Sequence, residues 1–282
     1  MNLYESPAAA VETMRIAQTN IQLYNQLIGQ GRADSDLETV RACYQLARKR
    51  YSGYYQADGK PFVAHGCGVA SIVAGLGLPG DMVGAACIHN IYGNGDFADA
   101  RKDSASPRRR RLVRQAVGMR VEELVYRFRV LLRSPGHPVL ELGNRLHDLS
   151  DTDRMLLAIE LADTLEICMD LGPLYYGDGS RRIDYVTRHG DRLIAIAHAL
   201  GHQRLSQALS VALAALLSES VPAVLRSSDP VGNDMSLCVP PSCALRPRVV
   251  LRKQWGALRS WLRVRKRIRA VFSGAADPKH VS

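Results

Sequence analysis

The feature that most constrains the fold of this chain is one polar residue on the apolar face of each of three predicted helices. These residues are His65, His89 and Asp163. Each lies at helical spacing from aliphatic side chains, so each is expected to point into the core. A buried carboxylate or imidazole without a partner is costly. The sequence therefore predicts that the three side chains converge, and a metal ion held among them would satisfy all three.

Helical periodicity extends over most of the chain. Apolar residues recur at three- and four-residue intervals, with glycine, proline and capping residues between the periodic segments. No segment alternates in the manner of a strand, and no internal repeat is present. These patterns predict an all-α fold. The predicted helices cover residues 8–30, 34–52, 64–78, 79–93, 106–132, 152–172 (with Thr152 or Asp153 as its cap) and 190–218.

The net charge of +10 is concentrated toward the end of the sequence. Residues 246–269 hold ten arginines and lysines and no acid, so the other 258 residues sum to zero. A proline-rich linker is predicted over 219–247, followed by a basic amphipathic helix at 248–272 and a tail at 273–282. A basic helix with tryptophans suits an anionic membrane surface or an acidic protein partner through residues 246–272. Nucleic acid fits less well, because no stacking platform accompanies the charge.

Several classes of protein are disfavoured by features that the sequence lacks. The first residues do not follow the pattern of a secretory signal, and no apolar run is long enough to cross a membrane. The six cysteines are scattered without a CxxC pair, which favours free thiols in a reducing cytoplasm and argues against a structural zinc site. No phosphate-binding glycine fingerprint is present. The arginine run at 108–111 is interpreted as a solvated helix face.

Three motifs resemble those of a known superfamily. They are Gly-Lys-Pro-Phe-Val-Ala-His ending at His65, Ala-Ala-Cys-Ile-His-Asn at 85–90, and Leu-Ala-Asp ending at Asp163. In this order and spacing, over roughly residues 36–175, they resemble the HD-domain metal-dependent phosphohydrolases, and within them the hydrolase domain of RelA/SpoT-type alarmone enzymes. With its "YGNGDF" segment, the chain looks more like a divergent bacterial group in which the aspartate of the His-Asp motif is replaced.

The resemblance implies an HD-like helical domain at 36–218, preceded by an N-terminal helix within 1–35. It implies a divalent metal, Mn, Fe or Zn, held by His65, His89, Asn90 and Asp163. Asn90 stands where the family has aspartate, and an amide oxygen is a weaker, uncharged ligand. Asp96, just beyond the second motif, is the candidate catalytic acid or base, with His147 and Tyr92 as alternatives.

Other positions that the alarmone hydrolases use also differ here. The family's acidic pair after the His-Asp motif is Gly93 and Asn94, its arginine before the first histidine is Gln56, and its final asparagine is Ile167. These differences argue against alarmone hydrolysis. Two hypotheses remain open. The first is metal-dependent hydrolysis of another phosphorylated small molecule. The second is a non-catalytic HD-fold module that binds a ligand or a protein and is recruited to a membrane surface or a partner by its tail. A cytoplasmic location is expected in both cases.

Overall fold

The structure is a computed structural model that describes residues 15–56, 58–99, 104–133, 136–176, 179–226 and 255. Within these ranges the chain forms helices and one isolated bridge, between Tyr55 and Pro61, and no strand. The predicted all-α fold is confirmed for this part of the chain. The α-helices are α1 (Asn20–Gly29), α2 (Asp34–Tyr51), α3 (Phe62–Gly75), α4 (Gly80–Cys87), α5 (Ile91–Asn94), α6 (Pro107–Leu132), α7 (Pro138–Gly143), α8 (Asp151–Cys168), α9 (Gly179–Ala199) and α10 (Gln203–Ser218). Short 3₁₀ helices lie at Leu146–Asp148, Gly172–Leu174 and Ala223–Leu225.

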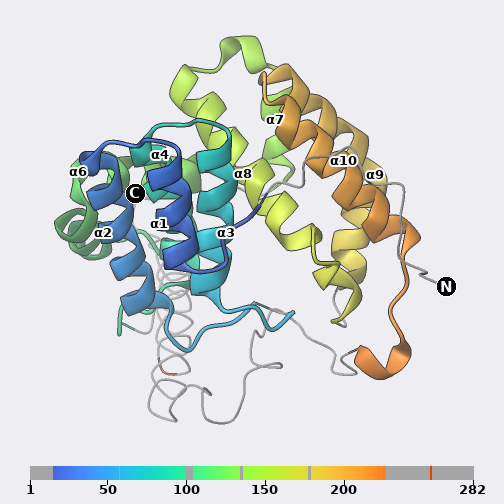
Figure 1. Ribbon diagram of the computed structural model, residues 1–282, viewed down its shortest axis with the longest axis horizontal. Helices are drawn as coiled ribbons and strands as arrows, with labels where there is room; N and C mark the ends of the chain where they lie inside the picture. Colours follow the sequence, from blue (N-terminus) through green and yellow to red (C-terminus); the bar gives the residue numbers. More distant parts are fainter. Residues whose placement is uncertain are drawn as a thin grey trace, which may run out of the picture.

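Helix α8 runs through the middle of the molecule (Figure 1). Helices α3, α4 and α6 contact it from one side, and α7, α9 and α10 from the other. Because it is covered on both sides, α8 is apolar around most of its circumference, as expected for a core helix. Its residues Leu156, Leu157, Ile159 and Leu161 have no exposed surface. Asp163 therefore lies in the core, because the helix that carries it is buried.

Helices α3 and α4 approach each other closely, and small residues make this possible. A β-carbon at Gly66 would collide with the backbone carbonyl of Cys87 at the end of α4. His65 precedes this glycine, and His89 follows the cysteine by two residues. The contact between the two backbones thus brings the two histidine-bearing segments together.

Several helix ends differ from the sequence prediction: the segment predicted at 190–218 begins at Gly179. Two other differences have a clear local cause. The first helix, predicted from residue 8, begins at Asn20 in the described part, because Thr19 and Gln22 form a reciprocal capping box. Helix α8 is capped by Ser150, and neither Thr152 nor Asp153 takes that role. The Ser150 hydroxyl accepts from the backbone N–H of Asp153 at 3.2 Å. Both ends are fixed by a hydroxyl residue just before the helix.

The arginine run at 108–111 is not uniformly solvated, which corrects the sequence interpretation. Arg109 is 1% exposed. Its guanidinium pairs with Asp99 and donates to the backbone carbonyls of Tyr92, at 3.2 Å, and Ser104, at 3.0 Å. A buried guanidinium is tolerated here because these groups meet its charge and its N–H donors. Arg109 thus secures the loop before α6.

The described cysteines, Cys43, Cys67, Cys87 and Cys168, are buried free thiols, as the scattered spacing predicted. None of the helices in the described ranges has the length and apolarity needed to cross a lipid bilayer. The linker predicted at 219–247 lies outside the described residues beyond residue 226. The predicted basic helix at 248–272 and the tail at 273–282 also lie outside them, apart from Trp255.

Candidate metal centre

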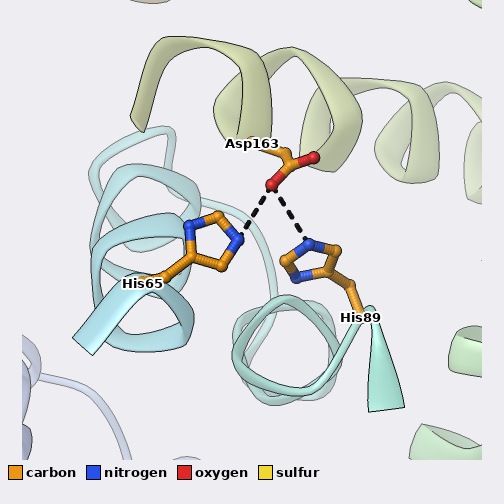
Figure 2. A group of neighbouring side chains, drawn as sticks. All are labelled: His65, His89 and Asp163. Atoms are coloured by element: carbon orange, nitrogen blue, oxygen red, sulfur yellow. Dashed lines mark ion pairs between the residues drawn. The ribbon is translucent and has the colours of Figure 1, made fainter. Parts of the chain in front are cut away.

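Three side chains from three segments meet beside α8 (Figure 2). His65 lies in the first turn of α3, His89 follows the end of α4, and Asp163 lies on α8. The Nε2 atoms of His65 and His89 lie 3.0 Å and 3.2 Å from the same oxygen, Asp163 Oδ1. The three side chains are at most 8% exposed. The structure thus brings together the trio predicted from the apolar faces of the helices.

His65 is oriented by a carboxylate behind it. Its Nδ1 lies 2.5 Å from Oε2 of Glu166, which has no exposed surface. The other oxygen of Glu166 accepts from Lys60 Nζ at 2.8 Å. A carboxylate on the far nitrogen holds the ring with Nδ1 protonated, and Nε2 is left to face Asp163. This arrangement is typical of histidines that bind metal ions.

Sequence reasoning missed Glu166 and Lys60, although a signal was present. Glu166 follows Asp163 by three residues, so the two carboxylates lie on one side of α8. Lys60 lies in the same Gly-Lys-Pro-Phe stretch that leads to His65. Because Asp163 was predicted to be buried, Glu166 beside it also needed a partner, and Lys60 was the cation in the stretch that leads to His65.

His89 is oriented by the backbone. Its Nδ1 lies 2.7 Å from the carbonyl oxygen of Ala86, so Nδ1 carries the proton and Nε2 carries the lone pair. This contact also explains why the helix predicted over 79–93 is interrupted. In a continuous helix the carbonyl of Ala86 would accept from the N–H of Asn90, but here it accepts from the imidazole of His89 and from the backbone N–H of the same residue at 3.5 Å, and α4 ends at Cys87. His89 is buried as predicted, but from a turn between α4 and α5.

Asn90, expected as a weak ligand, lies beside the trio. Its Nδ2 is 2.8 Å from His89 Nε2, and its Oδ1 accepts from Arg133 Nε at 3.2 Å. In this orientation the amide donates to the lone pair that a metal would use. A half-turn of the amide would present Oδ1 to the same space, so the residue can act as a ligand only after leaving Arg133.

Arg133 is the second group that sequence reasoning missed. It ends α6, and its guanidinium contacts Glu160 Oε1 at 2.7 Å and Asp163 Oδ2 at 3.3 Å. It also lies over the ring of Phe128, 5.1 Å from the centroid. Glu160 and Asp163 are both on α8, three residues apart, which lets one guanidinium reach both carboxylates.

The charges at the centre are strongly coupled. Burial alone would lower the pKa of His65, but the carboxylates of Asp163 and Glu166 outweigh it and raise the pKa to about 9. Burial alone would raise the pKa of Asp163, yet His89 and His65 hold it well below its ordinary value. Glu166 is lowered in the same way, its burial being outweighed by His65 and Lys60. The acids are therefore charged at neutral pH, as metal ligands must be, whereas His65 must release a proton before its Nε2 can bind a metal.

The surroundings of two buried atoms in the trio favour a bound cation at this place. Although His65 Nε2 and Asp163 Oδ1 are close, they have no partner with the geometry of a hydrogen bond in the described part of the chain. Buried polar atoms are nearly always paired, and such exceptions call for an ion or a water molecule. Two imidazoles and a carboxylate suit Mn, Fe or Zn, and their ligand atoms lie within 4.8 Å of one another. The residues present therefore fit a divalent metal ion.

The three candidate acid–base residues have other partners. Asp96 Oδ1 accepts from the backbone N–H of Ala98 at 2.8 Å, in the loop after α5. The Tyr92 hydroxyl donates to Glu122 at 2.7 Å within the core, and His147 lies on the surface beside Asp148. None of these contacts involves His65, His89 or Asp163. The catalytic role of Asp96 stays a prediction.

Comparisons with known proteins give one partial match. A family model described as a domain of unknown function (DUF6817) matches residues 46–133. The matched segment contains His65, His89, Asn90 and Arg133, and it ends before α8 and Asp163. No curated protein matches the chain.

Proposed function

We propose that this protein is a divergent HD-type, metal-dependent hydrolase that acts on a phosphorylated small molecule. The observation that carries the proposal is the approach of two Nε2 atoms to one carboxylate oxygen, Asp163 Oδ1, inside the core. Both rings are anchored through Nδ1, so that their free nitrogens face the same point. A bound divalent metal would supply an acidified water molecule and a Lewis acid for a phosphoryl oxygen.

The residues around the trio have defined tasks in this proposal. Glu166 and the carbonyl of Ala86 fix the protonation of His65 and His89. Lys60 balances the charge of Glu166. The apolar surroundings contributed by α3, α4 and α8 exclude bulk water, which strengthens every charge interaction at the centre. Three protein ligands leave coordination positions for water and substrate. We do not propose alarmone hydrolysis, because the substrate-binding positions of that family differ at Gly93, Asn94 and Gln56.

The proposal is tested with the full chain, Mn²⁺ and two chromogenic esters, p-nitrophenyl phosphate and bis-p-nitrophenyl phosphate. The key variant is Asp163→Asn, and the matched control is Asp153→Asn, which removes a carboxylate from the same helix where it pairs with Arg127. Wild type and control should release nitrophenolate. Asp163→Asn should lose at least about a hundredfold, since changes to groups behind metal ligands alone cost about 10- to 100-fold. Equal rates in both variants would refute the proposed site.

A second candidate function is a non-catalytic module that binds a ligand or a protein. It is favoured by one observation: Arg133 and Asn90 already occupy Asp163 Oδ2 and His89 Nε2. In that case the fold would need no metal, and chelator would leave the melting temperature unchanged. Recruitment by residues 246–272 stays a prediction. Equal liposome co-sedimentation of the full chain and of a chain ending at Leu245 would contradict it.

A further inference from the structure

Arg133 is the exposed member of the group of side chains around the trio. Its side chain is 30% exposed, whereas those of Asp163, His65 and His89 are 8%, 1% and 2% exposed. The guanidinium donates through Nε, Nη1 and Nη2 to Asn90, Glu160 and Asp163 respectively. Arg133 is therefore the most solvent-exposed of these four side chains, and it holds the amide of Asn90 in the orientation that faces His89.

The two oxygens of Asp163 have different partners. Oδ1 faces the two histidines, and Oδ2 lies 3.3 Å from Arg133 Nη2. A divalent ion bound at Oδ1 would thus share one carboxylate with a guanidinium cation. Like charges at such short range repel strongly in a partly buried site, and a carboxylate that already accepts a hydrogen bond from one cation binds a second cation less well. Metal and guanidinium are competitors for Asp163.

The surroundings give the guanidinium an alternative position. Arg133 also pairs with Glu160 Oε1 at 2.7 Å, a shorter contact than that with Asp163. The guanidinium can therefore leave Asp163 and Asn90 and keep its bond to Glu160. Release of Asn90 Oδ1 by the same movement would allow the amide to turn away from His89 Nε2. One displacement would then free an oxygen of Asp163 and a nitrogen of His89 together.

We propose that Arg133 is the internal counter-ion of the metal-free centre, and that a divalent cation binds by displacing its guanidinium from Asp163. This inference rests on the proposed metal centre. In this proposal the charge of Arg133 sets the affinity for the metal, and the amide of Asn90 turns away from His89 when Arg133 moves. A purely supporting role for Arg133, in which it holds Asp163 for the metal, predicts the opposite effect of removing it.

The test is calorimetric titration of Mn²⁺ into the full chain and three variants. Arg133→Gln removes the charge, Arg133→Lys keeps it, and Arg127→Gln removes a comparable α6-to-α8 ion pair, that with Asp153, outside the centre. We expect Arg133→Gln to bind Mn²⁺ about tenfold more tightly, from the loss of repulsion between close charges at the protein surface. Arg133→Lys keeps the charge and Arg127→Gln acts outside the centre, so both should stay within about threefold of wild type, a change of about 0.6 kcal/mol.

The outcomes separate the two proposals. Wild-type binding with weaker or unchanged binding by Arg133→Gln overturns the counter-ion role and leaves the metal centre intact. Binding by Arg133→Gln but not by wild type supports the counter-ion role. Binding by neither refutes both. If Arg133→Gln unfolds without metal, Arg133→Met replaces it, because an uncharged chain of similar length can still cover the ring of Phe128. Tighter Mn²⁺ binding than by wild type is then the expected result, and equal or weaker binding overturns the counter-ion role.

Discussion

At the scale of single residues, a histidine is oriented for metal binding when its second ring nitrogen is held by another group. In this protein the carboxylate of Glu166 holds Nδ1 of His65, and the carbonyl of Ala86 holds Nδ1 of His89. Periodicity predicted that both rings face inward, because burial follows from the spacing of apolar neighbours. It could not predict the anchors, since these depend on the direction of each ring and on a helix end.

Glu166→Gln tests the anchor of His65. An amide can still accept a hydrogen bond, but the substitution removes the negative charge that would make the His65 ring a stronger ligand for a metal. We expect Mn²⁺ affinity to fall by about 10- to 100-fold, as measured by calorimetry. Asp170→Asn is the control, because Asp170 shares Lys60 with Glu166 but is 60% exposed. A similar loss in both variants would show that Lys60, and not the anchor, is what matters.

Asn90→Asp tests whether a carboxylate at this position strengthens the proposed metal centre. A carboxylate at this position adds a charged ligand next to His89 and removes the amide N–H that faces Nε2. We expect Mn²⁺ to bind about tenfold more tightly, since carboxylate is a better ligand for such ions than amide. Asn90→Ala is the comparison, because it removes the amide without adding charge. Tightening by Asn90→Ala alone would point to the N–H as the obstacle.

At the scale of elements, most of the long helices were predictable, whereas α7, the first half of α9 and several helix ends were not. The apolar faces of α2, α3 and α8 repeat over many residues, so their existence and type are well defined. At the break after α4, the carbonyl of Ala86 accepts from the side chain and from the backbone N–H of His89, a local arrangement that periodicity does not show. Arg133 was missed for a similar reason. It lies at the end of α6, where no periodic pattern shows which neighbour a long side chain reaches.

Helix α6 contains a break at Gly118 that gives a prediction about stability. This residue has φ 84° and ψ 166°, a region essentially restricted to glycine. A β-carbon there would have no atom within 4 Å, so the cost of Gly118→Ala is confined to the backbone. We expect a loss of about 1–3 kcal/mol in the free energy of unfolding, measured in urea.

Gly29→Ala is the matched control for this substitution. Gly29 ends α1, and a β-carbon there also has no neighbour within 4 Å, but its backbone does not require glycine. The change should be neutral or stabilise by up to about 1 kcal/mol. A Gly118→Ala protein as stable as Gly29→Ala would mean that α6 is continuous in solution.

At the scale of the whole molecule, the centre links α3, the end of α4, α6 and α8 through charge. Stability without metal should therefore depend on pH. The pKa of His65 is raised from 6.5 to about 9 in the folded protein, so its contribution is complete below about pH 6.5 and is lost as the pH rises through 9. Asp163 and Glu166 have lowered pKa values, so their contribution is lost in acid. The optimum should lie between these limits.

Urea unfolding in the presence of chelator measures this dependence. Between pH 6.5 and pH 9 the wild type should lose about 3 kcal/mol more than His65→Gln, from the size of the pKa difference. Subtracting the variant removes the contribution of the buried cysteines, which titrate in the same direction. Equal losses in the two proteins would contradict the coupling of His65 to its two carboxylates.

The most direct test of the proposed metal centre is the metal content of the purified full chain, measured by elemental mass spectrometry. The double variant His65→Ala/His89→Ala removes two ligands. The control, His137→Ala/His189→Ala, removes another neighbouring histidine pair, with ring centroids 5.1 Å apart. We expect near-stoichiometric manganese, iron or zinc in wild type and control, and its loss from the first double variant. Metal that persists in that variant, or that is absent from all three proteins, would contradict a metal centre at His65, His89 and Asp163.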